Sequence, residues 1–349
     1  MKKINVGFDA CKMKYPNTGL RTFCEQLIPA LNNIAIKDNN ATFEVYLPSV
    51  AKGVLPKEIR SNTLHIWDRF LLKAPHINVW HQPFQSGSYF PRGEKATLLT
   101  IHDLNYLYED GGKRRNRMEK KVQRNINRSD RLVAISQYTK NDIIKNLDTQ
   151  GKDIDVIYNG CTKYTGPITP PEQSPEKPFL FNVGTLLSKK NVHVLPAILR
   201  NNDYLLYIAG NRSSYEEKII AEAKKFGVED RVRIIGPISE SEKHWYLKNC
   251  KAFMFPSIAE GFGLPVIEAM YYGKPCFLSK HTCLPEIGAD KAYYFNYEFD
   301  PDTMLNEFEK GMNDFATTNK SNAIIKHAEL FSWEKAAKEY WEIYRTIAK

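Results

Sequence analysis

The sequence predicts an α/β protein built from two Rossmann-like domains, each a parallel sheet with flanking helices. Three observations support this prediction. The chain has 349 residues, more than one ordinary core accommodates. Short β-rich runs alternate with helical patterns in both halves. A proline-rich stretch, 166–177, separates the halves, and proline cannot donate to a sheet ladder.

The first domain is expected over 1–165. Its predicted strands are rich in β-branched and aromatic residues and cover 4–10, 43–48, 77–82, 97–103, 131–136 and 155–160. Helical patterns cover 19–32, 114–128 and 137–147. Because strands and helices alternate, the strands are expected to pair in parallel.

After the 166–177 linker, the same alternation defines a second domain over 178–330. Its predicted strands are 179–184, 204–210, 232–236, 252–257 and 276–279, and its helices are 191–201, 214–227 and 239–249. A capping box formed by Ser239 and Glu242 marks the start of the last of these helices. The closing segment, 331–349, places aromatic residues on one stripe of a helix, which must pack on a large surface.

Composition limits the class of protein. The chain is 42% hydrophobic and 26% charged, as expected for a soluble globular protein, and it lacks the apolar run of about 20 residues that spans a bilayer. Its six cysteines are scattered and its start lacks a secretory pattern, so a cytoplasmic location is expected. The net charge of +9 fits nucleic acid, an anionic membrane or phosphorylated substrates. No nucleic-acid-binding signature is present, which argues against the first.

The most informative segment is PSIAEGFGLPVIEAMYYG, 256–273, which follows a predicted buried strand. Gly261 and Gly263 allow the backbone to approach an anion, and Pro265 suits the first turn of a helix. A helix N-terminus offers N–H groups to a diphosphate. Glu260 could then face a sugar, and Glu268, expected in the first helical turn, could accept ribose hydroxyls. A plain strand–turn–helix corner explains these residues equally well.

EGFGLPVIE resembles the glutamate–seven residues–glutamate signature of family 4 of the retaining glycosyltransferases, which have the GT-B fold. Other segments resemble the family in the same order along nearly the whole chain: Thr18–Gly19, TIHDL (100–104), VAISQYTKNDI (133–143), VIYNG (156–160), VGTLLSKKN (183–191) and the closing FSWE helix. The resemblance implies two domains facing a cleft. The N-terminal domain would bind the acceptor, the C-terminal domain would bind the nucleotide sugar, and the last helix would cross back to the N-terminal domain.

The resemblance also implies roles for single residues. Glu260 would be catalytic, in contact with the transferred sugar, and Glu268 would contact the ribose. The implied donor-binding residues are Gly19, Gly184, Thr185, Lys190, Gly261, Phe262, Gly263, Leu264 and Glu268. Many family members carry arginine where this chain has Thr185, so Lys189 or Arg21 would have to replace that cation. The 17–21 loop departs from the family pattern too, because Arg21 stands where relatives have a second glycine.

His102 is the second expected catalytic residue. It ends a predicted strand, beside Asp103, which could fix its orientation. The resemblance places this histidine near the reacting sugar, hydrogen-bonded to a hydroxyl. The alternative is a structural histidine, which is the interpretation preferred for His81.

Between Lys113 and Arg131, nine basic residues outnumber Glu119 and Asp130. One interpretation is contact with an anionic membrane that carries a lipid-linked acceptor. The other is an ordinary solvated helix face.

The expected function is metal-independent, retaining transfer of a hexose from a nucleotide-diphosphate sugar to a saccharide or lipid-linked acceptor, in cell-surface polysaccharide synthesis. The hexose is of the mannose, glucose, galactose or rhamnose type. No cofactor and no metal ligand are expected, because Asp153 and Asp155 begin a strand and do not form a metal clamp. The alternatives are an epimerase-like enzyme and a catalytically weakened sugar-nucleotide-binding partner. The absence of a G-x-G-x-x-G after the first strand argues against a dinucleotide dehydrogenase.

Overall fold

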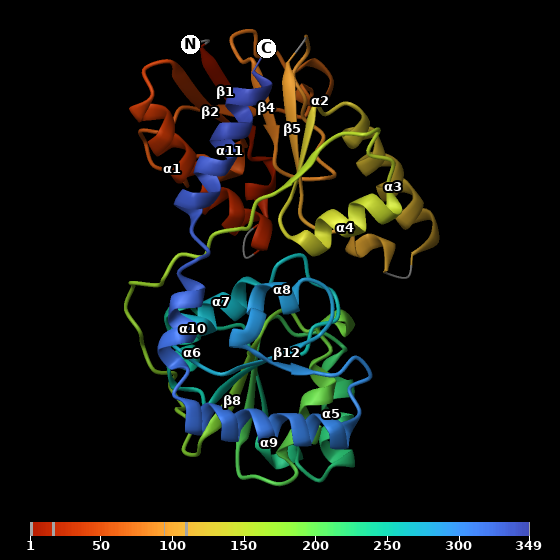
Figure 1. Ribbon diagram of the computed structural model, residues 1–349, viewed down its shortest axis with the longest axis vertical. Coiled ribbons are helices and arrows are strands. Elements are labelled where there is room, and N and C mark those ends of the chain that lie inside the picture. The colour runs from red at the N-terminus through yellow and green to blue at the C-terminus, as the bar shows by residue number, and fades with distance from the viewer. Residues whose placement is uncertain (1–2, 16–17, 94, 109–110, 349) are drawn as a thin grey trace. The chain divides into compact units, whose positions relative to one another are not determined.

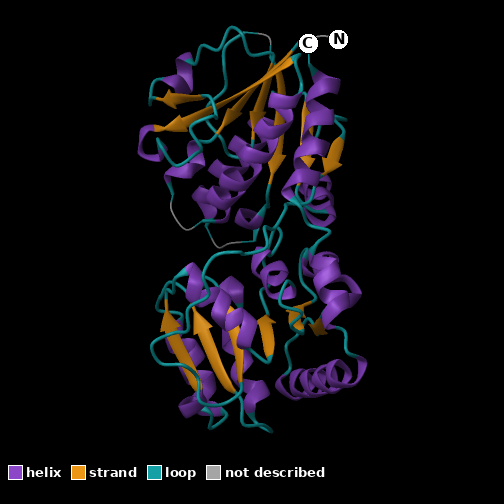
Figure 2. Cartoon of the chain, turned by 90° about the vertical axis from the view of Figure 1, so that its left-hand side faces the viewer, coloured by secondary structure: helices purple, strands orange, loops and turns teal. Residues whose placement is uncertain are grey.

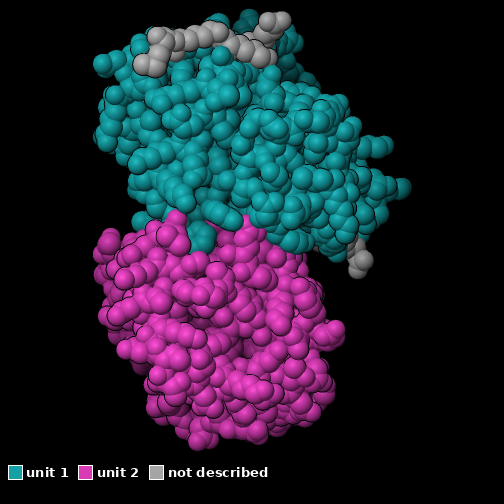
Figure 3. Space-filling view, in the orientation of Figure 1, with its two compact units in different colours: residues 1–162, 331–349 teal, residues 163–330 magenta. Residues whose placement is uncertain are grey.

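The computed structural model describes residues 3–15, 18–93, 95–108 and 111–348, and the chain divides into two compact units (Figure 3). The first unit comprises Met1–Thr162 together with Phe331–Lys349, and the second comprises Lys163–Leu330. Each unit has its own parallel sheet with flanking helices, which confirms the α/β prediction (Figure 2). The proline-rich connector has no regular secondary structure and belongs to the second unit, where Thr169 N donates to Ser241 Oγ at 2.9 Å.

The first unit contains a seven-stranded sheet in the order β3-β2-β1-β4-β5-β6-β7. Its strands are β1 (Ile4–Asp9), β2 (Ala41–Pro48), β3 (Ser61–Leu64), β4 (Val79–Gln82), β5 (Ala96–Ile101), β6 (Arg131–Ala134) and β7 (Ile154–Val156). Its helices are η1 (Cys11–Lys14), α1 (Gly19–Lys37), η2 (Ser49–Ala51), α2 (Asp68–Leu71), η3 (Asn105–Leu107), α3 (Gly112–Asn127), α4 (Gln137–Asn146) and α11 (Trp333–Ile347). Strand β3 escaped prediction because this polar edge strand lacks the apolar pattern of a buried one.

The second unit contains a six-stranded sheet in the order β10-β9-β8-β11-β12-β13. Its strands are β8 (Phe179–Val183), β9 (Leu205–Ala209), β10 (Val232–Gly236), β11 (Ala252–Phe255), β12 (Cys276–Ser279) and β13 (Tyr293–Phe295). Its helices are η4 (Ser188–Lys190), η5 (Val192–Leu199), α5 (Glu216–Lys225), η6 (Glu229–Arg231), α6 (Glu240–Asn249), α7 (Leu264–Met270), α8 (Leu284–Gly288), η7 (Ala289–Lys291), α9 (Pro301–Thr318) and α10 (Ser321–Ala328). The predicted helix over 191–201 is a 3₁₀ segment with Pro196 inside it, where proline removes a helical hydrogen bond.

Both sheets reverse their strand order once. In the first sheet the chain moves outward from β1 through β2 to β3, then returns to the other side of β1 with β4. In the second sheet the same reversal falls between β8 and β11. Open α/β sheets bind ligands in the crevice at such a reversal, outside the carboxyl ends of the strands.

The last helix, α11, packs on the first unit, beside α1 (Figure 1), as the resemblance implied. Its aromatic stripe is buried, and Trp333, Tyr340 and Trp341 belong to the same core cluster as β1 and α1. His81 of β4 joins the helix to the sheet, because its Nδ1 lies 2.6 Å from the Tyr344 hydroxyl and its Nε2 lies 2.8 Å from Thr100 Oγ1. His81 is therefore structural, as predicted.

Within the described part of the chain, no helix has both the length and the apolar character that crossing a membrane requires.

Candidate active site

The strongest constellation of predicted site residues lies at the strand-order reversal of the second sheet. Lys190 ends η4, which follows β8, and Glu260 lies in the loop that follows β11. The Lys190 ammonium and the Glu260 carboxylate form an ion pair, with side chains only 20% and 13% exposed. The Lys190 Nζ also lies 5.4 Å from the centroid of the Phe255 ring. Two residues that are 70 positions apart thus share one small site.

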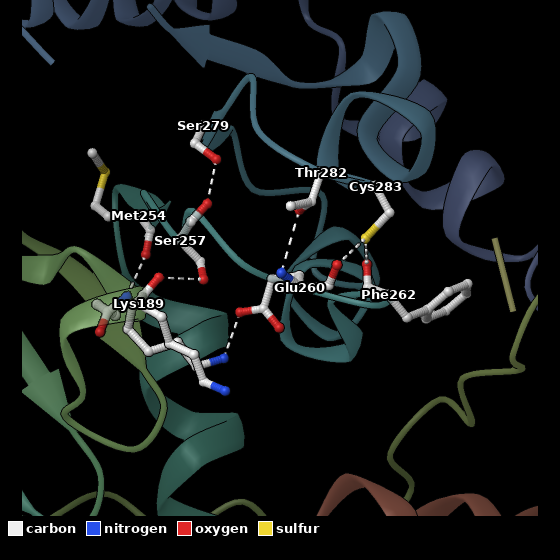
Figure 4. Close-up of polar contacts among 10 residues, drawn as sticks. Lys189, Met254, Ser257, Glu260, Phe262, Ser279, Thr282 and Cys283 are labelled. Atoms are coloured by element: carbon white, nitrogen blue, oxygen red, sulfur yellow. Dashed lines mark hydrogen bonds and ion pairs between the residues drawn. The ribbon is translucent and has the colours of Figure 1, made fainter. Parts of the chain in front are cut away.

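The Glu260 loop is held from the segment after β12 (Figure 4). The Glu260 amide donates to Thr282 Oγ1 at 3.3 Å, and the Cys283 thiol donates to the carbonyls of Glu260 and Phe262 at 3.5 and 3.3 Å. Burial raises the pKa of Cys283 well above its usual value, so the group remains a thiol able to donate. These contacts fix the backbone that carries the Glu260 carboxylate.

The Lys190 segment is tied to the same loop. The carbonyl of Lys189 accepts from the Ile258 amide at 2.9 Å and from Ser257 Oγ at 3.1 Å. Gly184 lies nearby, since a Cβ added there would stand 3.9 Å from Lys190 Cε, whereas Thr185 is exposed. The segment that follows β8 therefore carries Gly184, Thr185 and Lys190, and of these three Lys190 contacts Glu260.

Helix α7 begins as predicted. Gly263 is its N-cap with φ +100°, a conformation that glycine tolerates, and Pro265 lies in its first turn. The predicted residues Gly261, Phe262, Gly263 and Leu264 form the connection from Glu260 into this helix. They are continuous with the Glu260 site.

The prediction for Glu268 was wrong in one respect. It lies in the second turn of α7, and its Oε1 pairs with Lys243 Nζ of α6 at 3.0 Å. Burial raises the pKa of Glu268, and Lys243 partly offsets this rise. No sequence pattern identifies Lys243 as the partner of Glu268, because only tertiary packing brings α6 beside α7.

A second cluster near Glu268 offers metal-ligand atoms. One donor atom from each of Glu240, His244 and Glu268 lies within 4.8 Å of the others. The Lys243 ammonium is already 2.8 Å from Glu240 and 3.0 Å from Glu268. This lysine therefore occupies the place of a cation between the two carboxylates.

In the first unit, His102 follows β5 directly and is buried against the Phe23 ring, 4.7 Å between centroids. Its Nε2 lies 2.8 Å from the Pro83 carbonyl, which only accepts, so Nε2 carries the proton and Nδ1 can accept. Burial lowers the pKa of His102 to about 4, although the Pro83 contact raises it. At neutral pH the ring is uncharged. The carbonyl of Pro83 orients it, where the sequence favoured Asp103.

The Thr18–Arg21 turn starts α1. Thr18 caps the helix through its hydroxyl, which accepts from the Arg21 amide at 3.3 Å, and Gly19 has open space where a Cβ would stand. The Arg21 guanidinium pairs with Glu25 at 2.6 Å, so its charge is already matched within α1. Asn17 of the predicted loop lies outside the described residues.

Comparisons with known proteins cover both units. A model described as Glycosyl transferases group 1 matches residues 168–330, and one described as Glycosyltransferase Family 4 matches residues 40–162. The chain is 24% identical over 289 residues to O-antigen chain mannosyltransferase B of Escherichia coli, covering 77% of this chain and 74% of that protein. It is 32% identical over 160 residues to the lipopolysaccharide 1,6-galactosyltransferase of Salmonella typhimurium, covering 44% of each chain.

A similar solved structure is that of Anabaena HepE in complex with UDP and glucose. The TM-score is 0.69 with 16% identity, over 98% of this chain and 100% of that chain. This likeness concerns the fold.

The neutral His102 predicts a pH-dependent stability. Its folded pKa of about 4 lies below the usual 6.5, so the unfolded state takes up the proton first as the pH falls. We expect His102 to contribute nothing to this dependence above about pH 7, and to lower the free energy of unfolding by about 2 kcal/mol at pH 5.

The measurement is urea unfolding of the wild type and His102→Gln at pH 7.5 and pH 5. The loss of stability between the two pH values should be about 2 kcal/mol smaller in the variant. His65→Gln, at an exposed histidine, is the matched control and should keep the wild-type loss. An equal loss in all three proteins would contradict the expectation.

Proposed function

The chain belongs to the group 1 glycosyltransferases with the GT-B fold, and from this membership we propose that it transfers a hexose from a nucleotide-diphosphate sugar to a saccharide or lipid-linked acceptor. The observation that carries the proposal is the Lys190–Glu260 pair at the reversal of the second sheet. The names of the matched O-antigen and lipopolysaccharide transferases favour cell-surface polysaccharide as the product. They include mannosyl and galactosyl transfer; glucose and rhamnose types also fit the proposal.

In the proposed donor complex, the diphosphate binds Lys190 and the backbone between Gly261 and Leu264. Lys190 supplies one positive charge to the diphosphate. Once Lys190 leaves Glu260, the Glu260 carboxylate can accept a hydrogen bond from a sugar hydroxyl. Glu268 can keep Lys243 on Oε1 and accept a ribose hydroxyl on Oε2, since a carboxylate has two accepting oxygens. Gly19 of the first unit and Gly184 with Thr185 complete the proposed donor-binding set.

The proposed reaction breaks the bond between the anomeric carbon and the diphosphate oxygen. The acceptor hydroxyl attacks the same face of the sugar, and its proton passes to the departing phosphate, so the anomeric configuration is retained. Lys190 and the loop amides stabilise the leaving charge, which makes the reaction metal-independent. Neutral His102 accepts a hydrogen bond from a sugar hydroxyl at Nδ1.

We also propose that the basic segment Lys113–Arg131 contacts an anionic membrane that carries the acceptor. In α3 the apolar residues Val122 and Ile126 are buried, and the positive charges are mostly on the exposed side. The exposed basic residues of α3 are Lys113, Arg114, Arg115, Arg117, Lys120 and Arg124. Each such residue near an anionic surface contributes about 1 kcal/mol.

The first prediction concerns Lys190 and Glu260. A thermal-shift screen of nucleotide diphosphates identifies the base, because a bound ligand stabilises the folded state. We expect Lys190→Gln to lower the affinity for that nucleotide about 10- to 100-fold, because a charge-assisted contact is lost. Glu260→Gln should lower the transfer rate by about 10²–10³ and leave thermal stability near the wild-type value.

The control, Lys224→Gln, removes the same charge from an exposed site on α5 and should change neither the nucleotide affinity nor the transfer rate.

The stereochemistry is tested on the product of the wild type. The NMR coupling constant at the anomeric position of the transferred sugar should show the same configuration as in the donor. Full transfer by Glu260→Gln would refute the assignment. Conversion of the donor without any acceptor would instead favour the epimerase-like alternative, and nucleotide-sugar binding without turnover would favour the weakened binding partner.

The second prediction concerns metal. If Lys190 and the loop amides supply the stabilising charge, millimolar EDTA should leave the transfer rate unchanged, and added Mg²⁺ or Mn²⁺ should not raise it. The measurement is the initial rate after extensive dialysis against the chelator. A strong loss that a divalent ion restores would overturn the metal-free mechanism.

The third prediction concerns the membrane. The wild type should sediment with phosphatidylglycerol vesicles and not with phosphatidylcholine vesicles, and 0.5 M salt should release it. Arg114→Gln with Arg115→Gln and Arg117→Gln should weaken sedimentation about 100-fold. The control replaces three exposed lysines elsewhere, Lys52, Lys57 and Lys145, by glutamine. Equal loss in both variants would indicate a nonspecific effect of net charge.

A further inference from the structure

The first sheet has its own strand-order reversal, between β1 and β4, and its chemistry is not explained by the donor site. At this point Gln82 Nε2, at the end of β4, donates to Asp9 Oδ2, at the end of β1, at 2.7 Å. The chain then runs through 83–90, Pro-Phe-Gln-Ser-Gly-Ser-Tyr-Phe. This segment lies where open α/β sheets bind ligands.

Four cations from separate parts of the first unit converge on the 83–90 segment. Lys12 of η1 lies with Nζ 3.9 Å from the Phe84 ring centroid, and Lys121 of α3 donates to Ser88 Oγ at 2.8 Å. The two other contacts are Arg69 of α2 with the Tyr89 ring at 5.8 Å, and Arg128 at the end of α3 with the Phe90 ring at 3.1 Å. Three of these contacts fall on consecutive residues, 88–90.

Of these four charges, that of Lys12 acts on a carboxyl group, because it lowers the pKa of the buried Asp9, although burial raises that pKa more. Among the described residues, none of the four cations forms an ion pair with a carboxylate, and Arg128 donates to the neutral amide oxygen of Asn125. The carboxyl group of Asp9 is buried at the same reversal, but its oxygens accept from the Cys11 amide and from Gln82. Lys12 and Lys121 are partly buried, whereas Arg69 and Arg128 are exposed. Like charges held close together repel one another, and an anion bound among them would relieve that repulsion.

The ionisation of the lysine reflects this crowding. Burial lowers the pKa of Lys121, and the charges of Lys12 and Arg69 lower it further. The charge of an anion placed among these groups would raise the pKa of Lys121 and so oppose this lowering.

The segment is held rigidly and is linked to His102. Asn125 Nδ2 donates to the carbonyls of Gln85 and Gly87 at 2.8 and 3.0 Å. The Gln85 side chain accepts from the His102 amide at 3.3 Å, and the Pro83 carbonyl binds the His102 ring. The six residues from Pro83 to Ser88 span at most about 18 Å, so the Ser88 backbone, whose side chain binds Lys121, lies within the length of a short saccharide from the Pro83 carbonyl that holds His102.

We propose that Lys12, Arg69, Lys121 and Arg128 form a subsite for a phosphate or diphosphate group on the acceptor, so that the acceptor is an anionic, phosphorylated saccharide or its lipid-linked form. The inference rests on the proposed function only in taking the ligand to be the acceptor. The anion site itself follows from the arrangement within the first unit.

The test is calorimetric titration of the full chain with inorganic pyrophosphate in lipid-free buffer. Because Lys190 offers a second place for this probe, every protein carries Lys190→Gln. We expect this background to bind pyrophosphate, and the addition of Lys12→Gln with Lys121→Gln to weaken binding about 10- to 100-fold. The matched control adds Lys57→Gln with Lys145→Gln, two exposed lysines of the same unit, and should bind like the background.

The inference is overturned if the Lys190→Gln background does not bind pyrophosphate, or if the Lys12/Lys121 and control variants bind it equally. A second titration compares octyl diphosphate with mannose 6-phosphate. Tighter binding of the first that depends on Lys12 and Lys121 supports a lipid-linked diphosphate, whereas tighter binding of the second supports a soluble sugar phosphate. Dependence of neither on these lysines counts against the subsite.

Neither titration requires turnover of a substrate, so either proposal can be refuted while the other stands. If the wild type transfers no sugar from any nucleotide sugar yet binds pyrophosphate through Lys12 and Lys121, the proposed function fails and the anion site stands.

Discussion

The reversal of strand order in each parallel sheet is the constraint on which the site depends. All strands of a parallel sheet end at one edge, and the reversal leaves two neighbouring ends whose connections depart in opposite directions. In the second unit these ends belong to β8 and β11, so the turns that follow them bring Lys190 and Glu260 into contact. In the first unit the corresponding ends belong to β1 and β4, where Asp9 meets Gln82.

Hydrogen bonds to its backbone hold the Glu260 loop in place. Thr282, Cys283 and Ser279 hold the 257–262 backbone from the next strand connection, while the Lys189 carbonyl binds it from the other side (Figure 4). The backbone segments that carry the Glu260 and Lys190 side chains are therefore both held by hydrogen bonds. A backbone held in this way does not have to be ordered when a ligand binds.

The hydrophobic core of the first unit includes α11, the last helix of the chain. Helix α11 buries its aromatic stripe against α1 and the sheet, and Tyr344 and Tyr340 reach the buried His81 and Thr100. A neutral imidazole can satisfy both of its nitrogens there only because one neighbour donates and the other accepts. The two buried histidines of this unit thus differ in partners: His81 bonds two hydroxyls, whereas His102 bonds one backbone carbonyl.

The sequence alone determined the α/β class, most strands, the start of α7 at Gly263 and Pro265, and the aromatic stripe of α11. These features depend on local patterns: strand alternation, proline geometry and helical periodicity act over a few residues. The same local rules could not identify β3 or the partner of Glu268, since an edge strand is polar and Lys243 belongs to another helix. Only the tertiary structure brings Lys190 into contact with Glu260. It also brings the four cations to the 83–90 segment. Contacts between distant segments are set by strand order and packing, which no local pattern encodes.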